Sequence, residues 1–94
     1  MAIILVRHTV RDYDAWRKIY DGDAERRKAG GCTGTHVFRN SNDGNEIILN
    51  LQWDSVENAQ KFLTDPETPA AMASAGVIGQ PDIWFVDDAG RTAS

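Results

Sequence analysis

The sequence predicts one α+β domain whose elements run in the order β-α-β-β-α-β, and three observations predict it. Four runs rich in β-branched and aromatic residues alternate with two regions in which apolar residues recur at helical spacing. An Asp-Gly pair between the second and third of these runs is typical of a hairpin turn. The chain has 94 residues, which suits a single domain.

The first half of the chain contains two predicted strands joined by a helix. Residues 2–9 form an apolar, β-branched run without turn residues, which predicts a strand. Asp12 is expected to cap a helix over residues 13–28, and Gly30-Gly31 is expected to end it. Residues 32–39 then predict the second strand.

The second half repeats the alternation. The third strand is predicted over residues 46–53, and Ser55 is expected to cap a helix over residues 56–63. A short helical piece is expected over residues 69–75, followed by a loop and a last strand over residues 82–86. We therefore predict one domain over residues 1–88 and a flexible polar tail over residues 89–94.

This order of elements is that of the ferredoxin-like fold, with a four-stranded antiparallel sheet. Right-handed crossovers place the first and third strands side by side in the centre and both helices on one face of the sheet. The other face then carries apolar groups such as Ile48 with no helix to cover them, beside polar groups such as Asn50. A second copy of the chain stacked on that face would solve the problem, so we predict a homodimer that forms an α/β barrel.

Composition excludes several classes of function. The formal net charge is −4 and the pI is about 4.9, which argues against binding to nucleic acid or to an anionic membrane. The apolar start of the chain is too short for a signal peptide or a membrane span. The single cysteine, Cys32, permits no internal disulfide and no multi-cysteine zinc site, and we expect a cytoplasmic protein without a metal.

Several segments together resemble a known family. They are Val10-Arg11-Asp12-Tyr13-Asp14-Ala15-Trp16, Gly30-Gly31-Cys32-Thr33-Gly34, Val37-Phe38-Arg39, Leu51-Gln52-Trp53-Asp54-Ser55-Val56-Glu57-Asn58-Ala59 and Gly76-Val77-Ile78-Gly79-Gln80-Pro81-Asp82-Ile83-Trp84. With these segments, the chain resembles the dimeric α/β-barrel superfamily, and within it the small proteins similar to antibiotic-biosynthesis monooxygenases.

The resemblance implies a fold more than an activity. It implies a cofactor-independent monooxygenase or a cyclase or isomerase, acting on an apolar aromatic or polyketide-like small molecule, and it implies no cofactor. A non-catalytic dimer that binds a small ligand, or that serves a stress response, is the alternative. Haem degradation is disfavoured, because Phe62 stands on the second helix where haem-degrading relatives often carry a histidine.

The two histidines, His8 and His36, are the side chains suited to general base catalysis near neutral pH. Strand parity leaves open whether His8 points toward the helices or away from them, and a structural role remains the alternative. The side on which His36 lies depends on the hairpin register. A two-residue Asp43-Gly44 turn pairs Val37 with Asn50 and turns His36 toward the helices, and we expect this register; a shift by one residue reverses it.

Four further residues complete the candidate site. Asn50 is expected to stabilise a carbonyl or enolate oxygen, and Arg39 to offset negative charge. Gln52 is expected to bind the ligand, although Asn50 and Gln52 would also serve to bond across a dimer interface. Trp84 would wall an aromatic pocket or, alternatively, pack in the core.

Overall fold

The computed structural model describes residues 2–93. Within them, four strands and four helices follow one another in the predicted order, with the helix predicted over residues 13–28 divided into two. The elements are β1 (Ala2–Val10), α1 (Tyr13–Gly22), α2 (Ala24–Ala29), β2 (Cys32–Asn40), β3 (Asp43–Trp53), α3 (Val56–Thr64), α4 (Glu67–Ser74) and β4 (Val77–Val86).

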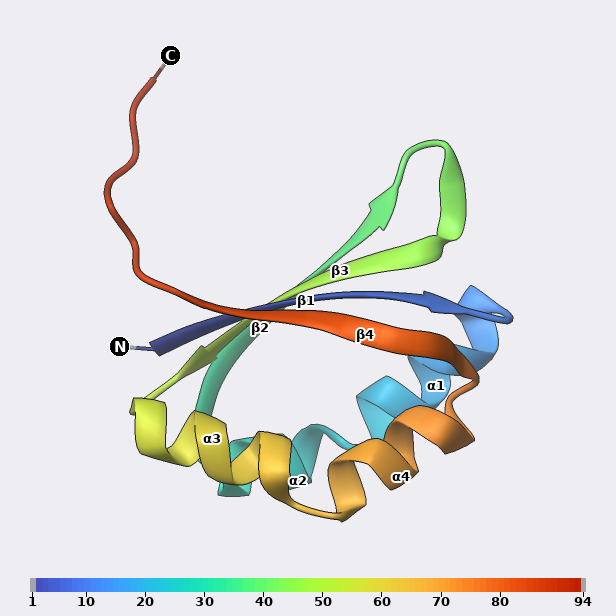
Figure 1. Ribbon diagram of the computed structural model, residues 1–94, viewed down its shortest axis with the longest axis horizontal. Coiled ribbons are helices and arrows are strands. Elements are labelled where there is room, and N and C mark those ends of the chain that lie inside the picture. The colour runs from blue at the N-terminus through green and yellow to red at the C-terminus, as the bar shows by residue number, and fades with distance from the viewer. Residues whose placement is uncertain (1, 94) are drawn as a thin grey trace.

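The four strands form one antiparallel sheet in the order β2-β3-β1-β4. As predicted, the first and third strands are the central pair, and all the described helices lie on one face of the sheet (Figure 1). No described helix covers the opposite face (Figure 1). This is the ferredoxin-like arrangement that the order of elements predicts.

The core lies between the helices and the sheet. On β3, the buried residues alternate with half-buried ones, because successive side chains of a strand point to opposite faces. The same alternation on β1 turns Ile4, Val6 and His8 toward the helices. Trp53 is fully buried on this face and packs against the ring of Phe62 on α3.

The face without helices, which we call the open face, is defined by strand register. Its residues are Ile3, Leu5, Arg7 and Thr9 of β1, Gly34, His36 and Phe38 of β2, Ile48, Asn50 and Gln52 of β3, and Ile78, Asp82, Trp84 and Val86 of β4. Phe38, Ile78 and Trp84 are exposed in the single chain.

The predicted hairpin register is wrong by one residue. Asn40 pairs with Asp43, so the turn is centred on Ser41 and Asn42 rather than on Asp43-Gly44. The side chain of Asn40 accepts a hydrogen bond from the backbone of Asn42 at 2.8 Å, which stabilises this earlier turn. The register then shifts between Arg39 and Asn40, and the rest of the ladder pairs His36 with Asn50 and Val37 with Leu49. His36 therefore lies on the open face, and Val37 faces the helices.

Two other boundaries differ from prediction. The first helix is interrupted at Asp23, directly after Gly22, although backbone hydrogen bonds from Asp23 to Ile19 and from Arg27 to Asp23 keep the two parts in phase. The last strand begins at Val77 rather than at residue 82, because a bulge opposite the segment between Arg7 and Thr9 absorbs the expected loop. Gly79 in this bulge has φ +72°.

The predicted helix caps are confirmed. Asp12 accepts a hydrogen bond from the backbone of Ala15 at 3.0 Å, and Ser55 accepts one from Asn58 at 3.1 Å. After β4, residues 87–93 form neither helix nor strand. Met1 and Ser94, which belong to the predicted domain and the predicted tail, lie outside the described residues. Among the helices that the structure describes, none is long and apolar enough to cross a membrane.

Candidate functional site

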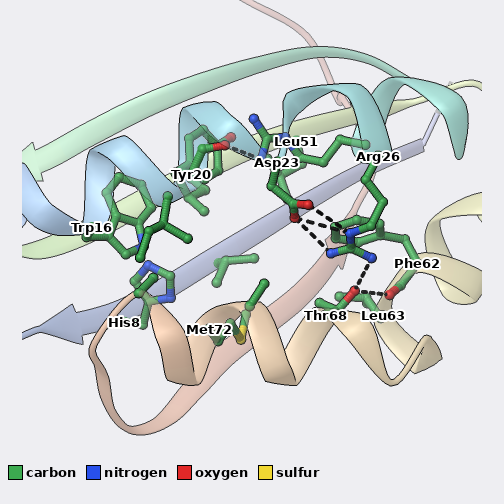
Figure 2. Close-up of a pocket in the computed structure, with 16 residues that line it drawn as sticks. His8, Trp16, Tyr20, Asp23, Arg26, Leu51, Phe62, Leu63, Thr68 and Met72 are labelled. Carbon is green, nitrogen blue, oxygen red and sulfur yellow. Dashed lines mark hydrogen bonds and ion pairs between the residues drawn. The ribbon is translucent and has the colours of Figure 1, made fainter.

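A cavity of about 60 Å³ lies between the helices and the buried face of the sheet. Its lining is mostly apolar, with a histidine at one end and charged side chains at the other (Figure 2). The lining residues are Val6, His8, Trp16, Ile19, Tyr20, Asp23, Arg26, Arg27, Leu49, Leu51, Phe62, Leu63, Thr68, Ala71, Met72 and Ala75.

His8 is the polar group at the inner end of this cavity. Its side chain reaches the cavity from the central strand β1, and only 5% of the residue is exposed. Neither ring nitrogen has a hydrogen-bond partner among the described residues. Burial lowers the pKa of His8, because the charged ring loses its hydration, so a neutral imidazole faces the cavity.

Aromatic rings from α1 wall the same end. Trp16 meets the His8 ring edge to face with centroids 5.6 Å apart, and Tyr20 stacks on Trp16 at 4.8 Å (Figure 2). The Arg27 guanidinium lies 3.8 Å from the Tyr20 ring centroid and donates a hydrogen bond to the Tyr20 carbonyl. Burial raises the pKa of the Tyr20 hydroxyl. These rings make this end of the cavity apolar and aromatic, which suits an apolar ligand.

Arg26 lies at the outer end of the cavity. Its guanidinium donates three hydrogen bonds at 2.9, 3.0 and 3.2 Å to the carboxylate of Asp23, and a fourth at 3.1 Å to the hydroxyl of Thr68 (Figure 2). The Thr68 hydroxyl in turn donates to the carbonyl of Phe62 at 2.6 Å, and Arg26 lies over the Phe62 ring. Arg26 thus connects α2 to α3 and α4 across this end of the cavity.

The structure divides the predicted site residues between two faces of the sheet. His8 lines the cavity, whereas Asn50, Gln52, His36 and Trp84 lie on the open face. Arg39 belongs to neither group: it lies over the ring of Tyr13 and donates a hydrogen bond to the carbonyl of Gly44. Asn50 and His8 of one chain are therefore not part of one pocket.

The open face has its own unsatisfied polar group. The side-chain oxygen of Asn50 is buried and has no hydrogen-bond partner among the described residues. Asn50 pairs in register with His36 on one side and with Leu5 on the other. His36 stacks on Phe38 with centroids 4.1 Å apart. A buried acceptor without a donor is rare in folded proteins.

Sequence reasoning misses most of the residues around His8. From the sequence alone, Trp16 is expected in the core, and Arg26 and Arg27 at a solvated helix end. Their spacing could have predicted that they lie together. Successive members are three or four residues apart, which places them on one helix face: Trp16, Tyr20, Asp23 and Arg27. Charged residues that continue an apolar stripe indicate a polar site at the edge of the core. Within residues 2–93, no cluster of three metal-ligating side chains is present.

Solved structures of known proteins share this architecture across nearly the whole chain. SnoaB, a cofactor-independent oxygenase from Streptomyces nogalater, matches with a TM-score of 0.73 and 14% identity, covering 98% of this chain and 95% of SnoaB. Rv0793 from Mycobacterium tuberculosis matches with a TM-score of 0.71 and 16% identity, covering 99% and 98%. The chain has the fold of the antibiotic biosynthesis monooxygenases.

A further structure with this monooxygenase fold contains a ligand. The monooxygenase from the gene ActVA-Orf6 of Streptomyces coelicolor, in complex with nanaomycin D, matches with a TM-score of 0.69 and 18% identity, covering 99% of this chain and 91% of that one. The sequence itself matches no family model and no curated protein. At these identities the likeness shows the fold, and the chemistry has to be argued from the residues of this chain.

Proposed function

We propose that the protein is a cofactor-independent monooxygenase that acts on a small hydroxylated aromatic molecule. The observation that carries the proposal is His8, a buried neutral imidazole that faces an apolar cavity with both ring nitrogens unpaired among the described residues. A neutral imidazole is a general base, and the apolar aromatic walls suit a planar substrate. The oxygenases among the structural neighbours support the same reaction class.

In this proposal His8 takes the proton of the substrate hydroxyl. The resulting electron-rich phenolate reacts with dioxygen at carbon to give a peroxide anion. His8 returns the proton to this anion, and the hydroperoxide loses water to give a quinone. One oxygen atom enters the product and the other leaves as water. The substrate itself supplies the two electrons that reduce the second oxygen atom to water. The reaction therefore balances without an added reductant.

Oxygen uptake with a panel of hydroxylated naphthalenes and anthrones tests this role. We expect His8→Gln to lower turnover by about 10²–10⁴-fold, the usual contribution of a positioned base, with a smaller effect on KM. His36→Gln is the matched control, because His36 lies on the other face of the sheet. Loss of turnover in His36→Gln but not in His8→Gln would refute the proposal.

The alternative is a protein that binds such molecules without converting them. It uses the same cavity, so binding alone does not separate the two functions. Saturable binding of the panel by the wild-type protein, with no oxygen uptake above the spontaneous rate, would favour this non-catalytic function.

We further propose that a second copy of the chain covers the open face. Phe38, Ile78 and Trp84 are exposed there, and an apolar sheet surface of this kind is an aggregation hazard in a monomer. The buried oxygen of Asn50 needs a donor that the described chain does not supply. A two-fold partner would cover the apolar side chains and bring polar groups such as Gln52 and His36 to the same surface.

We place the protein in the cytoplasm. Cys32 is its one cysteine, half-buried and not in a disulfide, which fits a reducing compartment. Fractionation of the native host followed by immunodetection would test this location.

A further inference from the structure

The outer end of the cavity has a polar group that the proposed reaction does not use. Arg26 lies there, opposite the end that holds His8 (Figure 2). We propose that Arg26 binds a neutral oxygen atom of the ligand, so that the site selects molecules with an apolar body and an oxygen at each end. The inference rests on the proposed function only in taking this cavity as the ligand site.

The geometry gives Arg26 a contact that a ligand can replace. Three of its hydrogen bonds hold the Asp23 carboxylate, on the same helical segment, and fix the guanidinium in place. The remaining contact runs from Nη1 to the Thr68 hydroxyl at 3.1 Å, across to α4. The Thr68 hydroxyl keeps its own bond to the Phe62 carbonyl, so it does not depend on Arg26. A ligand oxygen that replaces Thr68 would therefore leave neither residue without a partner.

The cavity volume indicates that this contact has to change. At about 60 Å³, the cavity is much smaller than the roughly 300 Å³ at which pockets for drug-sized ligands begin. The inner end is closed by β1, β3 and the buried ring of Trp16. At the outer end, α2 and α4 are joined by the bond between Arg26 and Thr68. Separation of these two side chains would lengthen the cavity toward Arg26.

The charges around Arg26 determine whether it would bind a neutral or an anionic oxygen of the ligand. Besides Asp23, the carboxylates of Asp65 and Glu67 lie 3.9 and 3.8 Å from the Arg26 guanidinium. With three carboxylates around one cation, another anion would be repelled, whereas a hydroxyl or ketone oxygen would still accept the Nη1 hydrogen bond. The ligand is therefore expected to carry a neutral oxygen at this end, as Thr68 does.

Equilibrium binding under anaerobic conditions tests the inference with three probes. They are 2-naphthol, 2,6-dihydroxynaphthalene and 6-hydroxy-2-naphthoate, which differ at one end only. Because a hydrogen bond to a charged donor is stronger than one between neutral groups, the wild-type protein should bind the diol about tenfold tighter than 2-naphthol. The naphthoate should bind more weakly than the diol.

Two variants separate ligand recognition from a structural role. Arg26→Gln should bring the affinities for the diol and for 2-naphthol together, while 2-naphthol itself binds as in the wild type. Thr68→Val removes the competing acceptor but keeps the guanidinium, so the preference for the diol should persist or increase. The symmetric diol can bind in two equivalent orientations, which adds the same statistical factor to its affinity in every protein. Comparing the ratio of the diol and 2-naphthol affinities between variants cancels this factor.

Three results would overturn the inference. They are no preference for the diol in the wild-type protein, equal loss of that preference in both variants, and no binding of any probe. Because no turnover is measured, a retained preference in a protein that consumes no oxygen would refute the proposed reaction and leave the role of Arg26 standing.

Discussion

His8 combines deep burial with ring nitrogens that have no partner in the described part of the chain. A buried polar group without a hydrogen bond costs about 1–3 kcal/mol, a cost that selection for stability alone would remove. The aromatic rings of Trp16 and Tyr20 further exclude water from the surroundings of His8. The same dryness keeps the imidazole neutral and able to take a proton, which links the instability of this position to the proposed function.

This environment predicts how stability depends on pH. The pKa of His8 in the folded protein is lowered by burial from its ordinary value of 6.5, which the unfolded chain retains. Between these two values the unfolded state binds more protons than the folded state. The contribution of neutral His8 to the free energy of unfolding is therefore fully present above pH 6.5. It is lost as the pH falls through 6.5 toward the pKa of His8 in the folded protein.

Urea unfolding of the wild-type protein and of His8→Gln at several pH values measures the effect. The free energy of unfolding of the wild-type protein should fall more steeply with acidification than that of the variant. Parallel pH profiles for the two proteins would contradict a neutral, buried His8. An NMR titration of the His8 ring would show directly whether its pKa lies below 6.5.

At the scale of the elements, the two glycines that flank α2 have different tasks. Gly31 has φ +110°, and a Cβ there would lie 2.6 Å from the Asp54 carboxylate, which is bonded to Asn58 at the start of α3. Gly22 ends α1 within a helical stretch, and a Cβ there would meet nothing within 4 Å. The first glycine is required by the backbone and its neighbours, and the second is not.

We therefore expect opposite effects from the same substitution. Gly31→Ala should destabilise the protein by about 1–2 kcal/mol, from the left-handed backbone and the displaced Asp54 side chain. Gly22→Ala should stabilise it by about 0.5–1 kcal/mol, because alanine loses less conformational freedom in a helix. Thermal and urea unfolding of both variants measures the difference, and a destabilised Gly22→Ala would show that the break at Asp23 needs glycine.

The elements that could be predicted from sequence are those fixed by local chemistry. Asp12 and Ser55 each precede an apolar helical pattern and cap it, as their side chains favour. The hairpin register could not be predicted in the same way, because Asn40, Asn42, Asp43 and Gly44 all favour turns. The bond from Asn42 to the Asn40 side chain selects one of the competing turns, and the register shift between Arg39 and Asn40 then places His36 on the open face.

The candidate site was harder to predict than the fold for a related reason. Which face His8 occupies follows from the burial of all of β1, and the sequence of that strand is apolar in both parities. The cavity depends on the packing of α1, α2 and α4 over the sheet, which brings Arg26 to Thr68 from 42 positions away. No sequence motif predicts either the face that His8 occupies or the contact between Arg26 and Thr68.

At the scale of the whole molecule, the sheet has one covered face and one open face (Figure 1). Leu5 lies at the centre of the open face, in register with Asn50 on one side and with Trp84 on the other. If a second copy covers this face, a charge at Leu5 would be buried without a partner in both copies. We therefore expect Leu5→Glu to convert the dimer to a monomer at micromolar concentration, as measured by analytical ultracentrifugation.

Val56→Glu is the control for the added charge. Val56 is about as exposed an apolar residue as Trp84 is, but it lies at the start of α3, away from the open face, where a glutamate also suits the helix N-terminus. This variant should remain a dimer. Because β1 also carries His8 on its other face, a monomeric Leu5→Glu that keeps its fold by circular dichroism would show whether the cavity needs the partner. A wild-type protein that sediments as a monomer would contradict the proposed dimer, because the apolar open face and the unpaired oxygen of Asn50 would then remain uncovered in solution.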